Sequence, residues 1–237
     1  MVQLPTSAHA VEHDFHDGLA YRTWMPETDP PWPGIVVLHG AGSCKENHAD
    51  FARLAADFGW AVLAYDQRGH GESLGEMSPG AVDDAVAMAR RLGSRDEVDP
   101  ERVCVRGSSM GGFVAIHSAA ISDAIAAAIA ICPPGEQMLA DSLRNDPLEM
   151  RADRDALEPW LAEHDLREAV ALMGEKPLIL LHAKGDEEVP CDWSQELYDR
   201  AAEPRKLVIV PGGHHRSIQH DAELQTVALR WVERELG

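Results

Sequence analysis

The chain has 237 residues, of which 45% are hydrophobic and 26% charged, so one large domain with a sizeable core is expected. Its formal net charge of −19 at pH 7 argues against nucleic acid and acidic membranes as partners, because both carry negative charge. No apolar run reaches the roughly 20 residues that a membrane-spanning helix needs, and the first residues do not resemble a signal peptide. The four cysteines are scattered without a Cys-x-x-Cys pair, and we expect a cytoplasmic protein.

Short apolar runs alternate along the chain with stretches whose apolar residues recur at helical spacing. The runs predict strands at residues 19–24, 34–38, 61–65, 102–106, 125–132, 178–182 and 207–210. Helices are predicted at residues 47–58, 82–92, 110–120 and 218–236. Alanine in residues 125–130 also suits a helix, but the alternation and the following prolines favour a strand. The order indicates an α/β fold, with a mostly parallel sheet covered by helices on both faces.

One stretch interrupts this alternation. Residues 133–176 separate two predicted strands by far more than a single crossover helix needs, and they read as short helices at 137–144, 155–162 and 166–173. Long insertions in a compact domain are usually lids or binding segments. We therefore predict a single domain over residues 1–237, with this insertion at about 133–176.

The run Gly-Ser-Ser-Met-Gly at residues 107–111 follows a predicted strand and precedes a predicted helix. A Gly-x-Ser-x-Gly run in this context is typical of a tight turn that lifts the central serine hydroxyl out of the sheet. We predict that Ser109 is a catalytic nucleophile and that Ser108 is its structural neighbour. The amide of Met110, at the helix N-terminus, is placed to stabilise negative charge on a substrate oxygen.

A serine nucleophile needs a base, and the base needs an acid that orients it. The chain order of hydrolases with this turn is serine, acid and histidine, with the acid after a late strand. Asp186 is the first carboxylate after the predicted strand at 178–182, and we predict it as the acid. Glu187 and Glu188 are the alternatives if the register of this loop is shifted.

The base is expected after the strand at 207–210, where Pro-Gly-Gly-His-His occupies residues 211–215. The pattern Pro-Gly-x-x-His selects His215, whereas a Gly-His pair would select His214. We predict His215 as the base and keep His214 as the alternative. His220 is expected at the polar start of the last helix.

A second oxyanion donor is expected in the loop after the strand at 34–38. His-Gly-Ala-Gly occupies residues 39–42, and the amide of Ala41 is the candidate donor. The His39 ring is expected to fix this loop by hydrogen bonding.

These pieces, together with Asp-Gln-Arg-Gly-His-Gly-Glu-Ser at residues 66–73, resemble the α/β-hydrolase superfamily over nearly the whole chain. Within it the chain is similar to small bacterial serine carboxylesterases, with kinship to cinnamoyl esterases, monoacylglycerol lipases and dienelactone-hydrolase-like enzymes. The resemblance implies that residues 133–176 form a cap over the serine and that residues 66–73 form a structural turn. Ser108 stands where relatives often have a histidine, which leaves the subfamily open. Serine at position 109, where other branches have aspartate or cysteine, argues against epoxide hydrolase, haloalkane dehalogenase and dienelactone hydrolase chemistry.

The predicted function is therefore hydrolysis of small aryl or short-chain acyl esters by a serine carboxylesterase that needs no metal or organic cofactor. A thioesterase, a monoacylglycerol or lysophospholipid lipase and an acyl-peptide hydrolase would use the same triad. A ligand-binding protein on a hydrolase scaffold is an alternative from another class. The partner is expected to be a small-molecule ester, and the oligomeric state stays open. Candidate substrate contacts in the cap are Trp160 and the apolar residues Met138, Leu139, Leu143, Leu148 and Met150.

Overall fold

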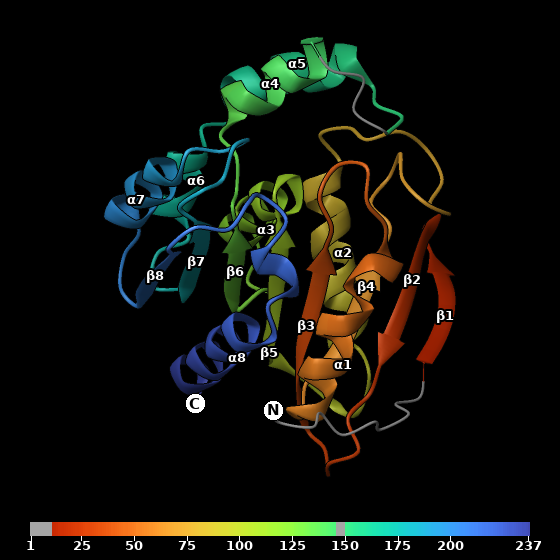
Figure 1. Cartoon of the computed structure of the whole chain (residues 1–237). Helices are drawn as coiled ribbons and strands as arrows, with labels where there is room; N and C mark the ends of the chain where they lie inside the picture. Colours follow the sequence, from red (N-terminus) through yellow and green to blue (C-terminus); the bar gives the residue numbers. More distant parts are fainter. Residues whose placement is uncertain (1–10, 146–149) are drawn as a thin grey trace.

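The computed structural model describes residues 11–145 and 150–237. Its centre is an eight-stranded sheet with the order β1-β2-β4-β3-β5-β6-β7-β8 (Figure 1). The strands are β1 Val11–His16, β2 Leu19–Trp24, β3 Trp32–Leu38, β4 Ala61–Tyr65, β5 Val98–Ser108, β6 Ala127–Ile131, β7 Leu178–Ala183 and β8 Arg205–Val210. The strands from β3 to β8 run parallel, while β2 pairs antiparallel with β1 and β4. The predicted α/β fold with a mostly parallel sheet is confirmed.

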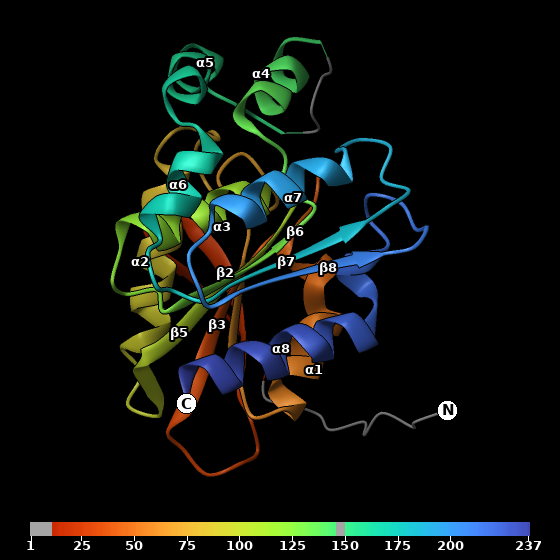
Figure 2. The same cartoon turned by 90° about the vertical axis from the view of Figure 1, so that its left-hand side faces the viewer.

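Helices lie on both faces of this sheet. They are α1 Ala49–Asp57, α2 Ala81–Gly93, α3 Met110–Ile121, α4 Glu136–Asn145, α5 Arg154–Glu163, α6 Leu166–Leu172, α7 Cys191–Arg200 and α8 Ala222–Leu236, with 3-10 turns at Lys45–His48 and Ile218–His220. α1 and α8 cover one face, and α2, α3, α6 and α7 cover the other (Figure 2). Since successive strand residues point to opposite faces, β3 sends Val36 and Leu38 into one core and Ile35 and Val37 into the other.

Residues 133–176, here called the cap segment, contain α4, α5 and α6. α4 and α5 stand above the carboxyl ends of the parallel strands (Figure 1), whereas α6 packs against α3 and α7. Backbone hydrogen bonds join the segment to the loop after β4. The amide of Met77 donates to the carbonyl of Arg151 at 2.9 Å, and the amide of Asp153 donates to the carbonyl of Met77 at 3.0 Å. These bonds place α5 over the loop between β4 and α2.

Three elements differ from the predicted ranges, and each has a physical reason. β1 forms no apolar run, because most of its residues are exposed. α7 was not predicted because few of its ten residues are apolar, and Trp193, Ser194 and Leu197 are the buried ones. The last helix begins later than predicted, because Asp221 caps α8 by accepting hydrogen bonds from the amides of Glu223 and Leu224. Within the described ranges, none of the helices combines the length and apolar character needed to cross a bilayer.

Candidate active site

Ser109 occupies the turn between the end of β5 and the start of α3. Its backbone has φ 53° and ψ −125°, in a region that non-glycine residues rarely adopt, and its amide donates to the carbonyl of Ile131 at 2.8 Å. A Cβ at Gly107 would collide with the carbonyl of Gly111, and one at Gly111 would collide with the carbonyl of Leu38. The two glycines are therefore required by close backbone approach, as the Gly-x-Ser-x-Gly pattern predicts.

The loop after β3 lies directly against this serine. A Cβ added to Gly40 would lie 3.2 Å from the Cβ of Ser109, so the neighbouring Ala41 belongs to the same small region. The amide of Gln67 donates to Nε2 of His39 at 3.0 Å, which leaves Nδ1 to donate to the carbonyl of Gly40 at 2.8 Å. Burial, aided by the nearby His70, lowers the pKa of His39 to about 4, so its ring is neutral near pH 7 and fixes the loop as expected.

Asp186 and His215 form a buried hydrogen-bonded pair. Nδ1 of His215 lies 2.8 Å from Oδ2 of Asp186, whose side chain is fully buried. Oδ1 accepts hydrogen bonds from the amides of Glu188 and Val189, each at 2.9 Å. Burial raises the pKa of Asp186, but the hydrogen bonds from His182, His215 and Val189 more than offset burial, and the net pKa lies well below the ordinary value. Because an ionised carboxylate only accepts hydrogen bonds, Nδ1 of His215 carries the proton and Nε2 keeps its lone pair.

The alternatives that the sequence left open occupy different positions. His214 is exposed, and its Nδ1 accepts a hydrogen bond from the amide of Arg216 at 3.3 Å. Glu187 is exposed, and the half-exposed Glu188 places its Oε2 3.7 Å from Nε2 of His215. Of these side chains, Asp186 and His215 are the pair that the structure brings together by a hydrogen bond.

His182 is a polar residue of this site that sequence reasoning missed. It is fully buried in β7, and its Nε2 lies 3.3 Å from Oδ2 of Asp186 and 3.0 Å from the carbonyl of Val189. Both of those atoms are acceptors, so Nε2 carries the proton and Nδ1 accepts from the hydroxyl of Ser194 at 2.6 Å. The available signal was a histidine at a strand end, four residues before the predicted acid.

Cys132, directly after β6, lies beside the same pair. Its sulfur, a carboxylate oxygen of Asp186 and a ring nitrogen of His215 all lie within 4.8 Å of one another. These atom types can bind a soft metal ion. However, the Asp186 carboxylate already receives several hydrogen bonds, and burial raises the pKa of the Cys132 thiol. A metal there would compete with the Asp186–His215 hydrogen bond.

The loop that carries His215 is fastened to the strand that ends at the serine. Gln219, four residues after His215, accepts a hydrogen bond from the hydroxyl of Ser108 at 2.6 Å through its Oε1. Its backbone carbonyl accepts another from Arg106 at 2.8 Å. These two bonds hold the β8–α8 loop against the carboxyl end of β5. Ser109, Asp186 and His215 all follow the carboxyl ends of parallel strands, and the hydrogen bond between Asp186 and His215 joins two of them.

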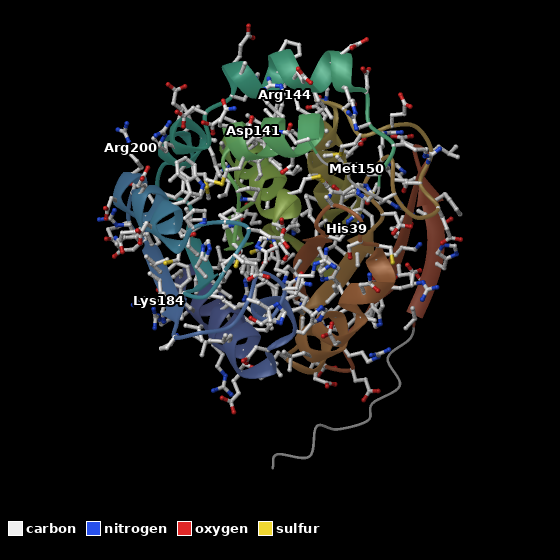
Figure 3. The ribbon with its side chains drawn as sticks, turned by 45° about the horizontal axis from the view of Figure 1, so that its top comes forward. His39, Asp141, Arg144, Met150, Lys184 and Arg200 are labelled. Atoms are coloured by element: carbon white, nitrogen blue, oxygen red, sulfur yellow. The ribbon has the colours of Figure 1, made fainter. Side chains whose placement is uncertain are left out.

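The candidate substrate-contacting residues of the cap segment separate into two groups. Trp160, Leu139, Leu143 and Met150 line an apolar pocket next to Met110, whereas Met138 is not among the lining residues. Leu148 lies outside the described residues. The outer side of α4 is charged, with Asp141 and Arg144 in an ion pair at 3.4 Å (Figure 3).

A comparison with known protein families gives a match to the alpha/beta hydrolase fold over residues 33–167, more than half of the chain. The chain belongs to the α/β-hydrolase family. It is 27% identical to the uncharacterized protein YfhR of Escherichia coli (strain K12), over 89% of this chain and 74% of that protein. Membership of this family supports the interpretation of the chain as a hydrolase.

Two solved structures carry the same fold. Est1E from Butyrivibrio proteoclasticus, determined with ferulic acid bound, superposes with a TM-score of 0.75 at 23% identity, over 95% of this chain and 98% of that one. The esterase Pf2001 of Pyrococcus furiosus superposes with a TM-score of 0.76 at 21% identity, covering 97% and 93% of the two chains. At these identities the likeness shows the fold, and esterases are among the proteins that share it.

Proposed function

We propose that the chain is a carboxylic ester hydrolase with Ser109 as nucleophile, His215 as base and Asp186 as acid. The observation that carries the proposal is the 2.8 Å hydrogen bond between Nδ1 of His215 and the buried Asp186, at the sheet edge that also holds the strained Ser109. This bond fixes the tautomer that leaves Nε2 of His215 free to accept a proton. The match to esterase folds agrees with the proposal.

The reaction then runs in two halves. His215 Nε2 takes the proton of the Ser109 hydroxyl as the oxygen bonds to the ester carbonyl carbon, and the amides of Ala41 and Met110 stabilise the oxyanion. The Met110 amide suits this role because the first amides of a helix have no intrahelical acceptor. The carbon–oxygen bond to the alcohol breaks, and the alcohol leaves with the proton from Nε2.

Water completes the cycle by the same route. It attacks the acyl carbon and gives a proton to Nε2, and the bond to Ser109 breaks as that proton returns to the serine oxygen. The products are one carboxylic acid and one alcohol for each ester and water consumed. No step needs a metal or an organic cofactor. Small aryl or short-chain acyl esters are the substrate class that the sequence suggests.

The test is hydrolysis of p-nitrophenyl acetate and butyrate beside matched thioesters and acyl-peptide anilides, by the wild type and by Ser109→Ala. An ester hydrolase should turn over the oxygen esters fastest, with turnover lost in the variant. Faster thioester or anilide cleavage would assign the same triad to a thioesterase or an acyl-peptide hydrolase. Folded wild type without turnover on any of them would favour a ligand-binding protein and reject the proposal.

A further inference from the structure

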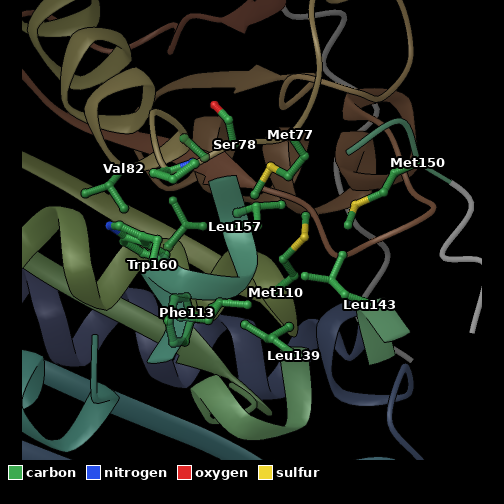
Figure 4. Close-up of a pocket in the computed structure, with 14 residues that line it drawn as sticks. Met77, Ser78, Val82, Met110, Phe113, Leu139, Leu143, Met150, Leu157 and Trp160 are labelled. Atoms are coloured by element: carbon green, nitrogen blue, oxygen red, sulfur yellow. The ribbon is translucent and has the colours of Figure 1, made fainter. Parts of the chain in front are cut away.

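An apolar pocket lies between the cap segment, α3 and the start of α2 (Figure 4). It opens to solvent on one side, and the space that the side chains enclose as they stand is small, about 30 Å³. Side chains from three separate stretches of sequence converge on it. They include Met77 and Val82, then Met110 and Phe113, and from the cap segment Leu139, Leu143, Met150, Leu157 and Trp160.

The pocket comes next to the proposed nucleophile at one residue, Met110. Met110 follows Ser109 directly and lines the pocket with its side chain, while its amide is the proposed oxyanion donor. Phe113 and Val114, one turn later on α3, continue the same wall. Ser109 and His215 are not among the lining residues, so part of an ester bound at Ser109 would reach this space past the side chain of Met110.

The lining offers almost no hydrogen-bond partner. Two lining residues carry polar side-chain groups, the hydroxyl of Ser78 and the indole N–H of Trp160, and the others are aliphatic, thioether or aromatic, or are proline. The charged groups of α4 and α5 pair with one another on the outside, where Arg144 lies 3.4 Å from both Asp141 and Glu158. A phenolic or hydroxylated substrate would lose its hydrogen bonds to water without replacement, at a cost in binding.

Trp160 is held in place by other rings. It stacks on His164 at a centroid distance of 4.2 Å and meets Phe113 edge-on at 6.0 Å. Nε2 of His117 is buried without a partner among these rings, but His117 is not one of the residues that line the pocket. The part of the pocket lined by Met77, Met110 and Met150 can change shape, because these flexible side chains can repack around a bound ligand.

We propose that this pocket binds an unbranched alkyl chain of the ester, in preference to the hydroxylated aryl group of a phenolic acid. The inference rests on the proposed ester hydrolysis and names its substrate class as aliphatic esters longer than acetate. The alkyl chain can belong to the acid or to the alcohol half of the ester, and the two sources share the same recognition chemistry. Each methylene that becomes buried should raise kcat/KM by roughly fourfold at most, until the pocket is full.

The experiment measures kcat/KM for two substrate series that vary one half of the ester at a time. One series is p-nitrophenyl acetate, butyrate, hexanoate and octanoate, and the other is ethyl, butyl, hexyl and octyl acetate. Methyl 4-hydroxycinnamate serves as the phenolic comparison. We expect a rise with chain length in at least one series, and the series in which it occurs identifies which half of the ester enters the pocket.

Two substitutions in α4 test whether the rise in kcat/KM with chain length depends on the pocket. Leu139→Trp places a bulky ring in the pocket and should lower the ratio of long-chain to short-chain kcat/KM roughly tenfold, as the loss of two buried methylenes would. Gln137→Trp adds the same ring to an exposed position of the same helix and should keep the wild-type ratio.

The outcomes separate this inference from the proposed function. Ser109-dependent acetate hydrolysis without a rise in either series would overturn the alkyl pocket and leave the esterase intact. Faster turnover of the hydroxycinnamate than of the long aliphatic esters would overturn it as well, as would an equal change in ratio for both tryptophan variants. Absence of turnover on every ester would instead reject the proposed function itself.

Discussion

The Asp186–His215 region and the pocket that Met110 lines under the cap segment are built by opposite means. Around Asp186, both carboxylate oxygens receive hydrogen bonds from backbone amides or histidine rings. The pocket, by contrast, is formed by apolar side chains with little hydrogen bonding. Strand ends supply the first region, and helices on one side of the sheet supply the second.

This difference indicates a division of roles. Hydrogen-bonded side chains at the ends of β5 and β7 and after β8 have narrow positional tolerance, which suits proton transfer. Apolar walls tolerate changes of shape more readily. Substitutions near Asp186 should therefore lower kcat for every substrate, while substitutions in the pocket should change the ranking of substrates.

Loss of the nucleophile or of its base should have the largest effect. Ser109→Ala and His215→Ala should each lower kcat on the order of 10⁴- to 10⁶-fold, because the members of a triad act as a unit. His214→Ala should stay within about twofold of the wild type, since His214 is exposed and bonds its own loop. Steady-state kinetics on p-nitrophenyl butyrate provide the check, and inactivity of His214→Ala with an active His215→Ala would reverse the assignment.

Asp186→Asn should lower kcat by about 10⁴-fold, because an amide can present a donor to His215 and favour the wrong tautomer. KM should change little, since Asp186 is buried behind His215 and away from the pocket. Glu188→Gln, with its half-exposed side chain, is the matched control and should retain most of the activity. A larger loss for Glu188→Gln than for Asp186→Asn would move the acid to Glu188.

His182→Ala should lower kcat by roughly tenfold, because Asp186 loses one hydrogen-bond donor worth about 1.5 kcal/mol or more. His182→Gln, which can again donate an N–H to the carboxylate, should recover part of the loss, whereas His16→Ala in the edge strand should change nothing. An unchanged kcat in folded His182→Ala would show that the other donors suffice to hold Asp186.

Burial lowers the pKa of four histidines, His39, His48, His70 and His117, and these groups make stability depend on pH. Burial, aided by neighbouring histidines, lowers the pKa of both His39 and His117 to about 4, from an ordinary value of 6.5. Between these values the unfolded chain binds more protons than the folded one, so the free energy of unfolding falls as pH falls from about 6.5 to about 4. Each of these two histidines contributes up to ~3 kcal/mol over this interval.

Urea unfolding of His117→Phe at pH 7 and at pH 4.5 tests this dependence. The variant should lose less stability than the wild type between the two values, because one of the titrating buried histidines is absent while His39, His48 and His70 remain. His16→Ala, at a more exposed position on the sheet edge, should keep the wild-type difference. An equal loss of stability in His117→Phe and the wild type would contradict the buried, neutral state of His117.

The central sheet was predictable because β3, β4, β6 and β7 are buried on both faces and read as continuous apolar runs. α7 was not, since its apolar residues are too few to show a helical period. For Ser109, Asp186 and His215, the order along the chain sufficed to identify candidates for the site.

Side chains that act through space were harder to predict. His182 reaches Asp186 because the loop after β7 turns back on its own strand, and the sequence signal for this contact was only a histidine at the strand end, four residues before the acid. In the cap segment, neighbours on α4 differ, since Leu139 lines the pocket and Met138 does not. The packing of α4 on the rest of the domain decides which of these two residues lines the pocket, and helical spacing alone does not predict this packing.

Covalent labelling of the nucleophile tests the account most directly. The purified protein is treated with a fluorophosphonate, and the adduct is located by peptide mass mapping. We predict one adduct on Ser109, absent in Ser109→Ala and formed far more slowly in His215→Ala. An adduct on another residue, or no adduct on the folded wild type, would contradict the assignment of Ser109 as the nucleophile.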